Sequence, residues 1–168
     1  LAESGVVVAN AYGTTTHTTK ALVGLMCGMH PHPSMELHET KPGGIPFPCL
    51  PDLMTAAGYR SAFMQSAAGG FEDRRVLTAN MGFQTITAQE DMPTEGFEAV
   101  GYVSMDEKVM LKPALKFMQE GDKPFLLTML TSVPHHPYHV PGSAAPGGGD
   151  DIREFYKKAM AHVDAFVG

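Results

Sequence analysis

The sequence predicts an α/β fold in which a mostly parallel sheet is covered by helices on both faces. Strand-like and helix-like segments alternate along the chain, and the connections between strand candidates are long enough for parallel pairing. One candidate, residues 123–133 (KPFLLTMLTSV), is apolar almost throughout. Such a run is typical of a central parallel strand that is buried on both faces.

Two other segments are predicted as strands of the same sheet. Residues 5–10 (GVVVAN) are short and apolar, which is typical of a buried strand. Residues 60–66 (RSAFMQS) form the second candidate. Each strand candidate leads into a loop and then into a helix-like segment, as crossovers between parallel strands require.

Five helices are expected, each with an apolar face or a start or stop signal. In the fourth, Ser104 and Glu107 form a capping box, and Pro113 is expected to kink the helix. Asp150 or Asp151 caps the last helix. The expected helices lie within residues 19–29, 49–59, 67–83, 104–121 and 150–168.

Length and charge limit what the chain can do. The 168 residues suit a single domain, and 43% of them are hydrophobic, which is enough for a core. A net charge of −6 argues against a nucleic-acid-binding protein, which would present a basic surface. No apolar run approaches the roughly 20 residues of a membrane-spanning helix. Because the chain begins and ends within regular patterns, we expect a fragment of a longer protein.

Two polar clusters follow strand candidates that are far apart in the sequence. Residues 14–19 (TTTHTT) supply five threonines, and residues 134–139 (PHHPYH) supply three histidines. Ligands of open α/β sheets bind beyond the carboxyl ends of the strands, where such loops meet. We therefore expect both clusters at one edge of the sheet, where they would form a single site.

The threonine cluster suits chemistry on an anionic ester. Free N–H groups and the helix dipole favour a negative charge at the start of a helix. A divalent metal could make a hydroxyl there an alkoxide nucleophile that attacks a phosphate or sulfate ester. The alternative is a threonine-rich helix cap with no catalytic role.

The histidine cluster and an arginine pair could hold the same anion. His135 and His136 could bind phosphoryl oxygens, protonate a leaving group or ligate a metal. Arg74 or Arg75 could clamp an anion with a bidentate guanidinium. The alternatives are a surface loop that merely contains histidine and a solvated helix start.

The ordered motifs resemble a known family over nearly the whole chain. They are NAYGTTTHTTKALVGLMCGMHP, LPDLMTAAGYRSAFMQS with GFEDR and MGF after it, SMDEKV, KPFLLTMLTSVPHHPY and FYKKAMAHVDAFVG. This order resembles the sulfatase and lipoteichoic-acid-synthase branch of the alkaline phosphatase superfamily. The resemblance implies an alkaline phosphatase-like sheet, with residues 1–168 as a partial sulfatase-type catalytic domain truncated at both ends.

The resemblance implies a nucleophile among the threonines. Thr16 falls where the family has its metal-bound nucleophile, and Lys20 falls where sulfatases have a substrate-binding arginine. Thr18 and Thr19 remain alternatives. Threonine cannot become formylglycine, the modified residue of sulfatases. The resemblance therefore favours phosphoglycerol or phosphoethanolamine transferases, which use an unmodified threonine.

Other matched positions imply substrate contacts. His135 matches a substrate-binding histidine of the family, and its neighbour His136 is a second candidate. Arg74 matches the arginine of a motif in which Glu72 replaces a tryptophan, so contacts to the substrate head group are expected to differ. Gln65 lies near the position of another substrate histidine of that branch, which also indicates a different substrate.

The resemblance also implies a divalent metal (Mn, Zn, Ca or Mg) whose other ligands precede Leu1 and follow Gly168. These 168 residues alone are therefore expected to be inactive and to bind metal poorly. The longer protein is expected to be membrane-anchored, with its catalytic domain periplasmic or extracellular. A disulfide between Cys27 and Cys49 would fit that oxidising compartment. Two buried thiols are the alternative.

Three functions are consistent with these observations. The first is a metal-dependent phosphoric-ester transferase or hydrolase with a threonine nucleophile and a substrate that is lipid- or glycan-linked. The second is a sulfatase, and the third is a non-catalytic anion- or glycan-binding relic of the fold.

Overall fold

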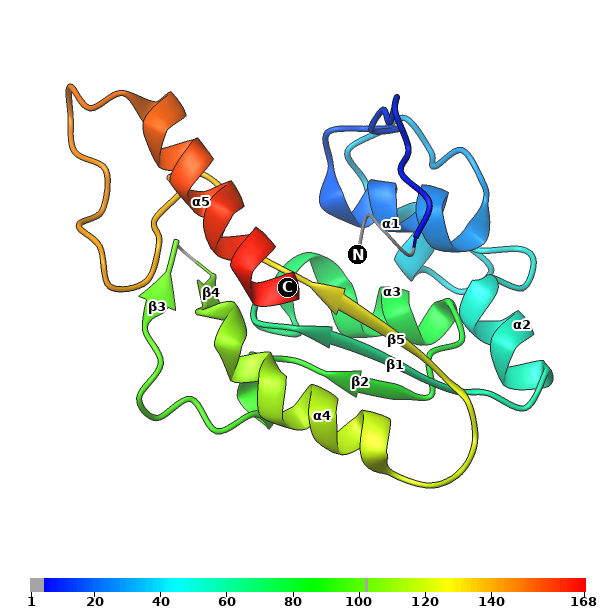
Figure 1. Cartoon of the computed structure of the whole chain (residues 1–168). Helices are drawn as coiled ribbons and strands as arrows, with labels where there is room; N and C mark the ends of the chain where they lie inside the picture. The colour runs from blue at the N-terminus through cyan, green and yellow to red at the C-terminus, as the bar shows by residue number, and fades with distance from the viewer. Residues whose placement is uncertain (1–4, 102) are drawn as a thin grey trace.

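The computed structural model describes residues 5–101 and 103–168, and within them three parallel strands form the central sheet (Figure 1). The strands are β1 (Arg60–Gln65), β2 (Thr85–Thr87) and β5 (Phe125–Leu130), in the order β2-β1-β5. All six residues of β1 pair in register with β5. Helices cover both faces of the sheet, which confirms the predicted α/β fold.

The helices connect the strands much as the sequence predicts. The α-helices are α1 (Thr18–Cys27), α2 (Leu50–Ala56), α3 (Arg74–Asn80), α4 (Leu111–Gln119) and α5 (Ile152–Val167). The 3-10 helices are η1 (His38–Thr40), η2 (Phe71–Asp73), η3 (Gln89–Asp91) and η4 (Glu107–Met110). A small antiparallel pair, β3 (Ala99–Val100) and β4 (Ser104–Met105), lies beside the sheet. In the described part of the chain, no helix combines the length and the apolar character needed to cross a membrane.

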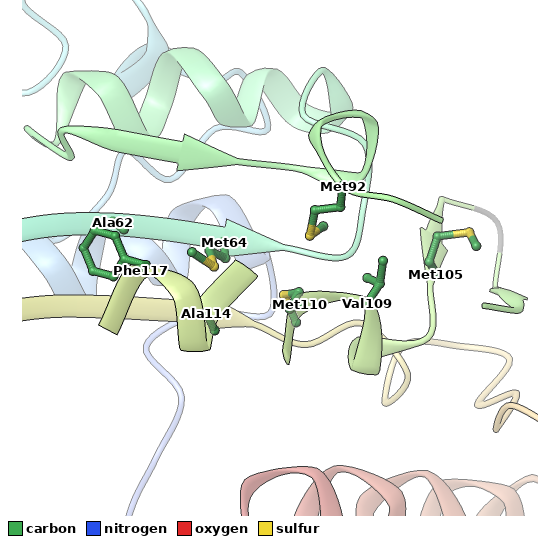
Figure 2. Close-up of a cluster of buried hydrophobic side chains, with 8 residues drawn as sticks. All are labelled: Ala62, Met64, Met92, Met105, Val109, Met110, Ala114 and Phe117. Atoms are coloured by element: carbon green, nitrogen blue, oxygen red, sulfur yellow. The ribbon is translucent and has the colours of Figure 1, made fainter. Parts of the chain in front are cut away.

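Side chains alternate along β1 and give the sheet a hydrophobic core on each face. Phe63 packs with Leu22 of α1 and Leu77 of α3 on one face. The other face packs against η4 and α4 (Figure 2). This second core consists of Ala62, Met64, Met92, Met105, Val109, Met110, Ala114 and Phe117. Because both faces of the sheet are covered, its open ends are where side chains can reach a pocket.

The last helix, α5, packs beside β3 and the loop that follows β5. Ala159 is fully buried and lies in a third core with Val100 and Val133. Phe166 packs against the methionine-rich core of Figure 2. The helix therefore covers the segment that carries the predicted histidine cluster.

Residues 5–10 do not form the predicted strand. Val6, Val7 and Val8 are 94%, 71% and 67% exposed, and they pair with no strand of the described sheet. The strand β5 is consequently at an edge of that sheet, not at its centre as predicted. An apolar, β-branched run shows that a segment can form a strand, but a strand also needs a neighbour for its backbone groups.

The predicted capping box at Ser104 is also wrong. Ser104 lies in β4, and its hydroxyl donates to the carbonyl of Val100 at 3.0 Å. The cap of η4 is Asp106, whose carboxylate accepts from the backbone N–H of Lys108 at 3.0 Å. Pro113 lies in the first turn of α4, where a missing N–H removes no helical hydrogen bond.

A disulfide joins Cys27, the last residue of α1, to Cys49, the N-cap of α2. Gly28 ends α1 with a φ of 63°, a left-handed conformation that glycine adopts readily. The disulfide therefore ties the carboxyl end of α1 to the core, while the amino end of the same helix carries the threonine cluster.

We expect the double variant Cys27→Ser/Cys49→Ser to lose about 3 kcal/mol of unfolding free energy, because opening this loop returns conformational freedom to the unfolded chain. Urea denaturation measures the difference. Reduction should destabilise the wild-type protein by a similar amount and leave the double variant unchanged. Equal stability of the oxidised and reduced wild type would contradict the prediction.

Candidate active site

A pocket lies beyond the carboxyl ends of β1 and β5, at the edge of the sheet where the sequence places its polar clusters. It contains about 510 Å³ of empty space, part of it open to solvent. Parallel pairing of β1 with β5 brings the loops after both strands to this edge. The lining residues are Thr18, Gln65, Ala67, Phe71, Arg74, Gly101, Val103, Ser104, Leu130, Thr131, Ser132 and His135.

Arg74 is the buried charge of this pocket. Its side chain is only 2% exposed, and its Nη2 donates to Glu72 Oε2 at 3.0 Å. Its Nε and Nη1 are buried and have no hydrogen-bond partner among the described residues. Burial lowers the pKa of Arg74, and the carboxylate of Glu72 opposes that shift. A buried guanidinium with unmet donors is well suited to bind a multi-oxygen anion.

Glu72 connects Arg74 to the start of α1. Its Oε2 accepts from the hydroxyl of Thr19 at 2.5 Å, and its Oε1 lies 3.3 Å from His17 Nε2. Glu72 and Asp73 have φ values of 53° and 49°, so two consecutive residues with side chains adopt the left-handed conformation. This turn aims the Glu72 carboxylate at α1 and begins α3 at Arg74, which sets the threonine segment beside the guanidinium.

Glu107 shapes the other side of the pocket, a role that the sequence analysis did not foresee. Its Oε1 accepts from the backbone N–H groups of Ser132 and Val133 at 2.6 and 2.5 Å. The next turn is closed by the N–H of His135, which donates to the carbonyl of Ser132 at 2.9 Å. A completely buried carboxylate thus holds the loop after β5 in place, and with it the imidazole of His135. Its sequence position suggested only a helix cap.

The pocket brings together some of the predicted site residues. Thr18, Arg74 and His135 all line it, and so does Gln65, although they come from separate parts of the sequence. The two arginines that the sequence offers are placed differently. Arg75 lies outside this lining, and its Nη2 pairs with Glu90 and Asp91 at 2.8 and 2.5 Å.

Three other predicted residues lie elsewhere. Thr16 and Lys20 line a second hollow of about 750 Å³, together with His17, His30 and His32. His136 is exposed and lines neither of these two pockets.

Lys20 is committed to a buried ion pair. It is only 3% exposed, and its Nζ donates to Glu39 Oε2 at 2.7 Å and to the carbonyl of Glu36 at 2.8 Å. Burial opposes ionisation of Glu39, but hydrogen bonds from Lys20 and from the backbone of His32 outweigh it and lower the pKa of Glu39 below 4.5. The ammonium group therefore holds the segment after α1 against the helix.

A family model for sulfatases matches residues 1–168. The chain belongs to the sulfatase family. Among solved structures, lipoteichoic acid synthase LtaP from Listeria monocytogenes is similar with a TM-score of 0.74 and 19% identity, over 92% of this chain and 39% of LtaP. A protein in the alkaline phosphatase superfamily from Vibrio parahaemolyticus is similar with a TM-score of 0.66 and 20% identity, over 91% of this chain and 40% of that protein. The chain thus has the alkaline phosphatase-like fold over about two fifths of the length of these structures.

The described residues do not assemble a complete metal-ligand set beside the threonines. The hydroxyls of Thr16 and Thr18 can each offer one oxygen ligand. Glu72 is the carboxylate that contacts this segment, and it already accepts from Thr19 and pairs with Arg74. A catalytic divalent metal of the kind that the family uses would need ligands in addition to these side chains.

We expect Arg74→Ala to weaken binding of inorganic phosphate about tenfold or more, because a charge-assisted hydrogen bond contributes about 1.5–3 kcal/mol. NMR titration of the protein with phosphate measures the change. The matched control is Arg75→Ala, which removes a neighbouring guanidinium outside the pocket and should leave phosphate affinity unchanged. Similar losses in both variants would show that the effect is not specific to the pocket.

We expect Glu39→Gln to lower the unfolding free energy by about 3 kcal/mol at neutral pH, because it leaves the buried Lys20 ammonium without its counter-charge. The folded-state pKa of Glu39 is depressed, so its ionised form stabilises the fold above pH 4.5 and that contribution is lost as the pH falls below this value. Denaturant melts at several pH values should show the variant and wild type converging in acid. Glu36→Gln, at an exposed ion pair with Lys41, is the control and should have little effect at any pH.

Proposed function

We propose that the protein transfers or hydrolyses phosphoric esters with a threonine hydroxyl as nucleophile. Arg74 carries this proposal. Its guanidinium is buried, two of its nitrogens lack partners among the described residues, and it shares a pocket with the hydroxyl of Thr18 and with His135. A phosphoryl group has several oxygens that could accept from those nitrogens and a phosphorus atom that the hydroxyl could attack.

The reaction follows from the roles of these groups. The threonine oxygen gives up its proton to solvent and attacks phosphorus in line, the bond from phosphorus to the ester oxygen breaks, and the alcohol leaves with a proton from His135 or solvent. The product is a phosphoester of the threonine that keeps any second ester group of the substrate. An acceptor hydroxyl or a water then attacks the same phosphorus and frees the threonine. Arg74 compensates the charge of the non-bridging oxygens in both steps, and His135 binds an oxygen or supplies the proton to the leaving group.

Two threonines are candidates for the nucleophile, and different observations support each. The family resemblance favours Thr16, which lines the second hollow together with Lys20. Thr18 is the one threonine of residues 14–19 that lines the Arg74 pocket, and it is the first residue of α1, where free N–H groups favour an anion. Thr19 is buried and donates to Glu72, so its hydroxyl positions the helix.

A divalent metal, which the family resemblance implies, would make the attacking hydroxyl easier to deprotonate and would screen charge on the phosphoryl group. We propose that most of its ligands come from protein segments beyond these 168 residues, since the side chains around the threonines offer an incomplete set. The isolated chain is accordingly proposed to be inactive in ester cleavage.

The substrate and location are part of the same proposal. LtaP is named as a lipoteichoic acid synthase. We propose a comparable class here, a phosphoric ester linked to a lipid or glycan, with the protein anchored to a membrane and its site on the periplasmic or extracellular side. The disulfide between Cys27 and Cys49 supports an oxidising compartment.

The test compares Thr16→Ala and Thr18→Ala in the full-length protein with a phosphodiester and a sulfate ester as substrates. The variant that lacks the nucleophile should lose at least about 10³-fold in kcat with the phosphodiester, since covalent catalysis then has no attacking group. Mass spectrometry of the trapped intermediate should place the phosphate on the same threonine.

Ser143→Ala is the matched control, because its exposed hydroxyl lies outside the pocket, and it should retain full activity. Faster turnover of the sulfate ester would instead establish a sulfatase. Unchanged activity in both threonine variants would refute a threonine nucleophile, and no activity on either ester would favour a non-catalytic anion- or glycan-binding role.

A further inference from the structure

Three potential metal ligands converge at the junction between η4 and α5. The Nε2 atom of His162 lies 3.6 Å from Asp106 Oδ1 and 3.7 Å from Glu107 Oε2. One ligand atom from each of these three residues lies within 4.8 Å of the other two. The group lies outside the lining of the Arg74 pocket and takes no part in the proposed reaction.

Two of these atoms are buried without a partner among the described residues. Glu107 Oε2 and His162 Nε2 both lie out of contact with solvent and accept or donate no hydrogen bond there. Glu107 is completely buried, and its other oxygen already accepts from two backbone N–H groups. Leaving a carboxylate oxygen buried and unpaired is costly, so a positive group at this point would relieve both atoms.

The separations match metal coordination better than a direct ion pair. A charge-assisted hydrogen bond between imidazole and carboxylate would bring nitrogen and oxygen to about 2.7–2.9 Å. Ligand atoms about 2.1 Å from a tetrahedral zinc ion are about 3.4 Å from one another. The observed distances of 3.6 and 3.7 Å are close to that tetrahedral edge, and all three ligand atoms lie within 4.8 Å of one another.

The donor set also indicates the class of ion. One imidazole nitrogen and two carboxylate oxygens suit zinc and related first-row divalent ions, whereas calcium and magnesium prefer oxygen alone. Asp106 Oδ1 accepts one backbone hydrogen bond, from Lys108, which fixes the carboxylate and leaves a second lone pair. The side chains of Asp106 and His162 are 10% and 13% exposed, so a water could complete a tetrahedron from the solvent side.

We propose that Asp106, Glu107 and His162 form a zinc site that fastens α5 to the η4 corner. The zinc binds Glu107 through Oε2, while Oε1 of the same carboxylate holds the loop after β5. The ion therefore stiffens the loop that carries His135 without entering the reaction. This site is separate from the threonines and does not depend on the proposed ester chemistry.

The test is equilibrium dialysis of the protein against Zn²⁺, with bound metal measured by mass spectrometry. Wild type should retain one equivalent more than either Glu107→Gln or His162→Gln, in which the affinity of this site should be weakened at least about 100-fold, since removing a ligand costs more than the 10–100-fold of an outer-shell change. The glutamine at 107 keeps a carbonyl oxygen for the two backbone N–H groups. His30→Gln removes an exposed histidine and should keep the equivalent.

Two further measurements use the wild-type protein alone, so they test the zinc site even if a variant fails to fold. Added Zn²⁺ should raise the Tm of chelator-treated wild type, and Co²⁺ in its place should give the strong visible absorption of a tetrahedral ion. Retention of the equivalent in both variants would assign it to other histidines and overturn the proposal. Absence of bound metal, with His162 protonated between the two carboxylates in NMR spectra, would also overturn it.

Discussion

Parallel pairing between β1 and β5 is the constraint on which the rest of the structure depends. Two strands far apart in the sequence can share a direction only if the chain returns across the sheet, and that crossover contains α3, β2, η4 and α4. Once the six paired residues are in register, the loops after Gln65 and Leu130 must emerge at the same edge. Arg74 and His135 meet because of this backbone arrangement.

Two buried ion pairs, Lys20 with Glu39 and Arg74 with Glu72, differ in how completely their charged groups are hydrogen-bonded. Lys20 and Glu39 meet at 2.7 Å, and the lysine also binds a carbonyl, so this pair is satisfied and serves structure. Arg74 is buried to a similar degree but has one carboxylate partner and two unmet nitrogens among the described residues. The incomplete pairing of Arg74, together with its place in the pocket, is the reason why we propose it as the anion-binding group.

The sequence predicted the elements with clear local signals and the edge where polar groups gather. The helix within residues 67–83 and the strand at residues 60–66 were found because their apolar spacing and end signals agree. The histidines after β5 lie at the predicted edge, but the predicted place of the threonines rested on a strand at residues 5–10 that does not form. Local patterns could not show that Val6–Val8 lack a strand partner, because pairing depends on distant backbone groups.

Side-chain partners were the least predictable part of the site. Lys20 occupies a position that suggested a substrate contact, but Glu39, nineteen residues further along, takes its charge. Glu107 suggested a helix cap, and instead it binds backbone groups in a different loop. Both cases depend on which carboxylate lies within reach in three dimensions, and no spacing rule in a single sequence contains that information. The choice between Thr16 and Thr18 as nucleophile also depends on three-dimensional contacts that the sequence alone does not contain.

The left-handed turn at Glu72 and Asp73 has a consequence for the evolution and engineering of this protein. Two non-glycine residues with φ near 50° store backbone strain, on the order of 1–3 kcal/mol each, that glycine would release. Glycine substitution at these two positions is therefore expected to stabilise the backbone. Glycine at 72 would also remove the carboxylate that contacts His17, Thr19 and Arg74. At position 72, relief of backbone strain and retention of the carboxylate contacts thus favour different residues.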